Sequence, residues 1–155
     1  MITFRRATIE DIDNLIDLRI EFLYEALKKS KDTPEENLRK SLVNYFNEHV
    51  QNDTFIAWFA LENNEIIATS GLSFYTVPPC FNNQTGEVAY IMNMYTKPNY
   101  RRKGIGTELF FKLLEEAKTK GIKKIVLHAT DDGHFLYEKH GFISDGSEMI
   151  LKIKE

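Results

Sequence analysis

The sequence contains a single cysteine, Cys80, among its 155 residues. One thiol cannot form an internal disulfide, and a chain that does without disulfides is typical of a reducing compartment. No apolar run approaches the length of a membrane-spanning helix. Residues 1–4 predict a strand rather than a cationic leader followed by an apolar segment. We therefore expect a cytoplasmic protein that does not interact with membranes.

The sequence also lacks a large excess of charge of either sign: its formal net charge is −3. Without a global positive field we expect no nucleic-acid partner. His134 and His140 have no neighbouring residues at metal-ligand spacing, so we expect no metal site. A length of 155 residues with 43% hydrophobic residues is ordinary for one globular domain, which we expect to span residues 1–155.

Alternating and helical apolar patterns predict a mixed α/β fold with the order β-α-α-β-β-β-α-β-α-β-β. The expected strands span residues 2–6, 54–61, 65–75, 87–96, 122–129, 142–143 and 148–153, the last two forming a hairpin. The expected helices follow Thr8, Pro34, Gly106 and Gly133. No repeat or linker interrupts this order, which is consistent with one domain.

Gly104 and Gly106 lie where the strand over residues 87–96 turns into an amphipathic helix. The first N–H groups of a helix have no intrahelical partners, and a residue without a side chain lets an anion approach them. Three cations, at residues 101–103, precede the first glycine. The stretch lacks the Gly-Lys-Ser/Thr ending of a P-loop and the third glycine of a dinucleotide-binding motif. It predicts a phosphate site of another kind.

Two motifs in this part of the chain resemble those of the GCN5-related N-acetyltransferase (GNAT) family. The acetyl-CoA motif Arg/Gln-x-x-Gly-x-Gly/Ala matches residues 101–106, preceded by Pro98 and Tyr100, and a second motif matches Leu-Tyr-Glu-Lys-His-Gly-Phe at residues 136–142. The resemblance is strong over residues 88–142. It implies a mixed, mostly antiparallel central sheet flanked by helices. It also implies acetyl-CoA as co-substrate and acetyl transfer to an amine that attacks directly in a ternary complex.

The resemblance also implies roles for single residues. The main chain of residues 94–96 would pair with the pantetheine arm, beside a bulge near Asn93. The N–H groups of residues 102–107 would bind the pyrophosphate. The three cations could be a solvated charge run, but from their place beside the glycines we expect at least one to contact the pyrophosphate or the 3′-phosphate of CoA. The implied cofactor-binding residues are Met94, Tyr95, Thr96, Arg101, Arg102, Lys103, Gly104, Ile105, Gly106, Thr107 and Thr130, the last standing where the family often has asparagine.

Tyr137 has two interpretations. Its neighbours Phe135 and Leu136 indicate a core aromatic, whereas the resemblance implies a general acid that protonates the departing thiolate. We adopt the catalytic interpretation, with Tyr137 as the catalytic residue.

The sequence leaves the general base, the acceptor and the oligomeric state open. Strand alternation puts Glu87 and Tyr90 on opposite faces, and the position of His128 indicates a packed histidine. A small-molecule amine or a peptide N-terminus could be the acceptor, and a homodimer is one of the oligomeric states left open. Two other functions compete with acetyl transfer. One is a CoA-binding sensor or interaction module without catalysis, and the other is a binder of an unrelated phosphate or nucleotide.

Overall fold

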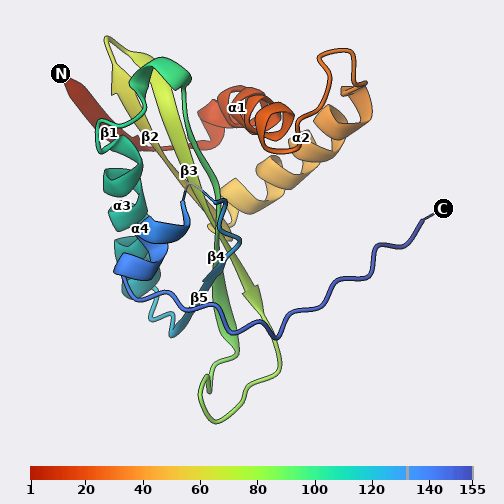
Figure 1. The fold of residues 1–155 in the computed structure, drawn as a ribbon, viewed down its shortest axis with the longest axis vertical. Helices are drawn as coiled ribbons and strands as arrows, with labels where there is room; N and C mark the ends of the chain where they lie inside the picture. The colour runs from red at the N-terminus through yellow and green to blue at the C-terminus, as the bar shows by residue number, and fades with distance from the viewer. Residues whose placement is uncertain (132, 155) are drawn as a thin grey trace.

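The computed structural model describes residues 1–131 and 133–154, and its centre is one five-stranded sheet in the order β1-β2-β3-β4-β5 (Figure 1). The strands are β1 Ile2–Arg6, β2 Phe55–Glu62, β3 Glu65–Thr76, β4 Glu87–Thr96 and β5 Lys124–Leu127. The first three pairings are antiparallel and only the pairing of β4 with β5 is parallel. The expected mixed, mostly antiparallel sheet is confirmed.

Helices cover both faces of this sheet (Figure 1). The helices are α1 Ile12–Ala26, α2 Glu36–Gln51, α3 Ile105–Thr119 and α4 His134–Lys139, with 3-10 turns η1 Ile9–Asp11 before α1 and η2 Pro98–Tyr100 before α3. Helices α1 and α2 lie on one side, and α3 and α4 on the other. Among the described residues, no helix is long and apolar enough to cross a membrane.

Each helical layer is held by a stripe of apolar side chains. Leu15 and Ile16 of α1 and Phe46 of α2 pack against Phe55 and other residues of β2. On the opposite face, the buried stripe of α3 consists of Ile105, Leu109, Phe110, Leu113 and Ala117. Burial of each large apolar side chain contributes about 1.5–3 kcal/mol, so both layers are firmly attached to the sheet.

The start of α1 is fixed by Thr8 and Asp11. The Thr8 hydroxyl accepts the N–H of Glu10 at 3.2 Å, and the Asp11 carboxylate accepts the N–H of Thr8 at 2.8 Å, as in a capping box. The Arg5 guanidinium donates to both Asp11 oxygens at 2.8 Å. These hydrogen bonds lower the pKa of Asp11 to about 2. They anchor the helix whose later turns reach the candidate site.

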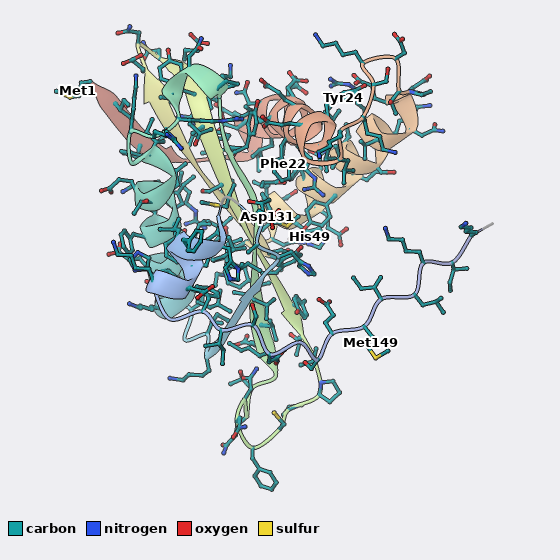
Figure 2. All side chains as sticks on the ribbon, viewed as in Figure 1. Met1, Phe22, Tyr24, His49, Asp131 and Met149 are labelled. Carbon is teal, nitrogen blue, oxygen red and sulfur yellow. The ribbon has the colours of Figure 1, made fainter. Side chains whose placement is uncertain are left out.

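The expected C-terminal hairpin is wrong. Residues 142–154 form no strand, and β5 is shorter than the predicted strand over residues 122–129. Figure 1 shows this segment running away from the body, and Figure 2 shows Met149 projecting from it. Alternating apolar residues favour a strand only where an edge is available for pairing, and an isolated two-stranded hairpin is marginal in water. The exposed apolar side chains are Ile143, Met149, Ile150, Leu151 and Ile153.

Candidate functional site

Strand β4 contains a bulge at Asn93, where its register with β3 shifts. Thr69 of β3 pairs with Tyr95, but Gly71 pairs with Met92, so β4 carries one extra residue between these pairs. Asn93 has φ +57°, a left-handed conformation that asparagine adopts more readily than most residues. A bulge bends the strand that contains it, and this confirms the bulge expected near Asn93.

The two parallel strands diverge at the same point. Their pairing ends at Ile91 of β4 and Leu127 of β5. On the β5 side, no described strand pairs with residues 92–96 of β4. Main-chain N–H and C=O groups left unpaired at such an edge can bind an extended ligand in the manner of an added strand. Residues 94–96, expected to bind the pantetheine arm, lie in this unpaired stretch.

A cavity of about 190 Å³ lies at this divergence, and helix α1 covers part of it. It is lined by Arg19, Phe22, Tyr90, Ile91, Met92, Asn93, Met94, Leu127, His128, Thr130 and Tyr137. Figure 2 labels Phe22 on the α1 wall. The lining therefore joins residues from α1, β4, the end of β5 and α4 that are far apart in the sequence.

The glycine turn at the start of α3 leaves backbone donors and open space. The first intrahelical hydrogen bond runs from the N–H of Glu108 to the carbonyl of Gly104 at 3.1 Å, so the preceding N–H groups lie before the helical hydrogen-bond pattern. Gly104 has φ +80°, which explains why this position requires glycine. A Cβ built on either Gly104 or Gly106 would meet no heavy atom within 4 Å.

Gly106 is explained by neither conformation nor packing. It has no positive φ and lies in α3, where glycine costs up to about 1 kcal/mol relative to alanine. The described atoms leave room for a side chain there. A ligand that approaches the helix N-terminus would use this room, and the dipole of α3 favours an anion. The turn therefore fits a phosphate group.

The three cations beside the turn differ in their contacts. Arg101 donates from Nε to the carbonyl of Thr96 at 2.8 Å and from Nη2 to Glu25 at 2.7 Å. Arg102 and Lys103 are exposed, and no described carboxylate lies within ion-pair distance of either. The structure brings all three to the turn, but a phosphate contact by any of them stays a prediction. Arg102 and Lys103 are the better placed because their charges are not neutralised.

Tyr137 is both packed in the core and placed on the cavity wall, so its position fits both interpretations from the sequence. Its ring packs against Phe110 and Phe142, with centroids 5.5 and 5.9 Å apart, and it also lines the cavity. Burial raises the pKa of its hydroxyl above the ordinary tyrosine value. The phenol therefore keeps its proton at neutral pH, as a general acid must.

Gly133 lies close to the side chains of both Thr130 and Tyr137. The Thr130 hydroxyl accepts the N–H of Gly133 at 3.2 Å. A Cβ on Gly133 would lie 3.1 Å from the Tyr137 ring and 3.3 Å from the Thr130 hydroxyl oxygen. A side chain at residue 133 would therefore require the Tyr137 ring or the Thr130 hydroxyl to shift by a few tenths of an ångström. Thr130 lines the cavity, and its role toward a cofactor stays a prediction.

Two cavity residues, Arg19 and His128, were not predicted from the sequence to belong to the site. Arg19 donates from Nη1 to the Asn93 side chain at 2.6 Å, and its signal was a charge within the mainly apolar stripe of α1. His128 is exposed, although its ring lies edge-on to that of Tyr90 with centroids 5.6 Å apart, and its Nε2 lies 3.7 Å from a Glu148 oxygen. Glu87 is exposed at the far end of β4 and is not among the cavity residues. Burial raises the pKa of Tyr90, so Tyr90 is not a base at neutral pH.

In the described part of the chain, no three His, Cys, Asp or Glu side chains are grouped to hold a metal ion. The polar groups of the site are backbone amides, hydroxyls, the Asn93 side-chain amide, an imidazole and cations. Such groups can bind a phosphate-bearing ligand and transfer protons.

Comparisons with known proteins agree with this arrangement. The family model described as Acetyltransferase (GNAT) family matches residues 20–142. A crystal structure of a predicted acetyltransferase with acetyl-CoA, from Clostridium acetobutylicum, is 36% identical with a TM-score of 0.90, and the match covers 98% of this chain and 96% of that one. A GCN5-related N-acetyltransferase from Ralstonia eutropha JMP134 is 25% identical with a TM-score of 0.87 over 99% of both chains.

Among curated proteins, a glucosamine 6-phosphate N-acetyltransferase from Trypanosoma brucei brucei is 29% identical over 83 residues. That match covers 54% of this chain and 56% of the relative, so the matched region spans little more than half of the relative's length. The family match is longer and includes the bulge at Asn93, the glycine turn and α4. The chain therefore belongs to the acetyltransferase (GNAT) family.

Proposed function

We propose that the chain is an acetyl-CoA-dependent N-acetyltransferase, in which an acceptor amine attacks directly in a ternary complex. The observation that carries this proposal is Gly106, whose missing side chain leaves open space at the N-terminus of α3 without a packing or conformational reason. The Clostridium acetobutylicum protein was solved with acetyl-CoA, which supports the same ligand here. The substrate named for the Trypanosoma brucei brucei relative is an amine, which supports an amine acceptor.

The chain would hold the cofactor along two adjacent surfaces. The N–H groups of residues 102–107 and the exposed cations Arg102 and Lys103 would bind its phosphates. The main-chain groups of residues 94–96 that face the β5 side, apart from the Thr96 carbonyl that accepts from Arg101, would bind the pantetheine arm. Acetyl-CoA supplies an acetyl thioester when bound. Backbone N–H groups of the same stretch would stabilise the negative charge that develops on the carbonyl oxygen.

Two side chains of the cavity would transfer protons. An ammonium group has no lone pair, so the acceptor must lose a proton before it can attack. We assign this proton to His128, because its imidazole lies on the cavity wall with the Glu148 carboxylate 3.7 Å from Nε2. The Tyr137 hydroxyl would donate its own proton to the departing thiolate, since burial keeps the phenol protonated.

The glycine assignment can be tested with a graded series at residue 106. Gly106→Ala and Gly106→Val should leave the melting temperature unchanged or raise it, because the described structure has room for the side chain. Acetyl-CoA affinity should fall with side-chain size, roughly 100-fold for valine, as one or two hydrogen bonds to charged phosphate oxygens are lost. Isothermal titration calorimetry measures the affinity.

Asn37→Val is the matched control, because Asn37 is also the second residue of its helix and is exposed. It should leave acetyl-CoA affinity unchanged. Normal affinity in Gly106→Val would reject the phosphate site. Thiol release from acetyl-CoA with a panel of amines then tests catalysis, and tight binding without turnover of any amine would identify a CoA-binding sensor instead.

A further inference from the structure

Arg19 is a cation on the wall of the cavity, and the described residues that line this cavity include no carboxylate. Four other arginines, Arg5, Arg6, Arg39 and Arg101, each lie within 4.0 Å of a carboxylate, and Arg102 is exposed to solvent. Within residues 1–131 and 133–154, no carboxylate lies that close to Arg19, and the hydrogen bond recorded for its guanidinium goes to the neutral amide of Asn93. Four of the five N–H donors of a guanidinium are not accounted for by that bond.

The Glu148 carboxylate beside His128 on the cavity wall is not within ion-pair distance of Arg19. Arg19 is half-buried on α1, and the groups that interact with its charge are the phenols of Tyr90 and Tyr45. Burial lowers the pKa of Arg19 from its ordinary value, yet a guanidinium stays charged in proteins. A partly desolvated charge without a partner is unfavourable. A ligand that brings an anion into the cavity would remove this cost.

The chemistry of the guanidinium defines the anion. Its planar donors match the two oxygens of a carboxylate or of a phosphate. The Asn93 amide fixes Nη1 at 2.6 Å, and Asn93 is itself buried in the bulge. The cation is thus held in place before a ligand arrives, which reduces the entropy lost on binding.

We propose that Arg19 binds an anionic group of the acceptor, so that the acceptor is an amine that also carries a carboxylate or a phosphate. This inference rests on the proposed acetyltransferase function. It assigns the α1 wall of the cavity to the acceptor and the α3 turn to the cofactor. It also makes Arg19 the residue that discriminates between anionic and neutral amines.

Matched pairs of amines test the proposal. We would compare β-alanine with β-alaninamide, phosphoethanolamine with ethanolamine, and glucosamine 6-phosphate with glucosamine, each added to the protein in the presence of CoA. At least one anionic member should raise the melting temperature more than its neutral partner. The first pair isolates the carboxylate, and the other two isolate the phosphate.

Substitution of Arg19 should remove this preference. Arg19→Gln should abolish the additional stabilisation by the anionic amine and raise its KM roughly 10- to 100-fold, the loss expected for one charged hydrogen-bonded contact. The KM of the neutral partner and the affinity for acetyl-CoA should not change. Arg19→Lys keeps the charge and should recover part of the effect. Arg39→Gln, which removes an exposed ion-paired arginine, should change neither parameter.

Each outcome separates this inference from the proposed function. Thiol release that is equal for neutral and anionic amines would overturn the role of Arg19 and leave acetyl transfer intact. Selective stabilisation that depends on Arg19, without thiol release from any amine, would support the anion site and reject catalysis. Equal loss of acetyl-CoA and amine binding in both Arg19 variants would make Arg19 a support of the bulge and overturn the proposal. If none of the three anionic amines raises the melting temperature more than its neutral partner, the proposal is also overturned.

Discussion

The Nε of Arg101 donates a 2.8 Å hydrogen bond to the carbonyl oxygen of Thr96, and so joins the first residue of the glycine motif to the last residue of β4. The same guanidinium forms an ion pair with Glu25 of α1 at 2.7 Å and lies over the Tyr95 ring, 5.6 Å from its centroid. Arg101 therefore connects α1, the strand end and the turn. Its neighbours Arg102 and Lys103 have no such connections to described carboxylates.

This difference predicts separate effects for the cations. Arg101→Ala should lower stability by roughly 1 kcal/mol, since its ion pair is half-exposed and its bond to a carbonyl is of ordinary strength. For a chain of this length, thermal denaturation should show a decrease of about 2–4 °C. The double variant Arg102→Ala/Lys103→Ala should keep its melting temperature and bind CoA more weakly, with a smaller dependence on salt. Equal weakening of CoA and dephospho-CoA would exclude contact with the 3′-phosphate.

Tyr137→Phe should separate chemistry from binding. The phenylalanine ring keeps the packing against Phe110 and Phe142, and no hydrogen bond of the Tyr137 hydroxyl is recorded in the described residues. Stability and acetyl-CoA affinity should change little. Turnover should fall toward the lower end of the roughly 10²–10⁴-fold contribution of general acids, because a thiolate is a fair leaving group. Steady-state kinetics measures this, with Tyr75→Phe as the control, and a full rate would assign Tyr137 to the core alone.

His128→Gln should reduce turnover by roughly 10²–10⁴-fold without changing the affinity for acetyl-CoA, since it removes the proposed base and keeps a polar side chain. The loss should be smaller for an acceptor such as hydroxylamine, whose amine is largely unprotonated at neutral pH. His140→Gln is the control, because His140 packs against Phe110 and Phe111 and is not among the cavity residues. If both amines lose rate equally, His128 does not act as the base.

The sequence was sufficient for the features that depend on local patterns. The strand over residues 87–96 matches β4 at both ends, because its apolar run is closed by a proline two residues later. The glycine turn and the short helix with Tyr137 follow from glycine positions and helical spacing. The C-terminal hairpin was wrong because strand propensity does not specify a pairing partner. The homodimer and the cytoplasmic location stay predictions.

The cavity itself could not be assembled from the sequence. Arg19 and Asn93 are 74 residues apart, and their hydrogen bond depends on how α1 crosses β4. The charge within the apolar stripe of α1 indicated an unusual position but not its neighbour. His128 was assigned to the packed face of a strand, whereas β5 ends one residue earlier and leaves this residue exposed. Boundaries and tertiary neighbours therefore decide which polar residues form the site.

Asn93 imposes an evolutionary constraint on this fold. Its main chain forms the bulge at φ +57°, and its side chain holds Arg19. A replacement must tolerate the left-handed conformation, which leaves glycine and aspartate as the main alternatives. Glycine would release Arg19, and aspartate would neutralise it. A substitution at residue 93 that keeps the bulge therefore still changes how Arg19 is held or neutralised, so within such a lineage the cavity can diverge while the shape of the strand stays constant.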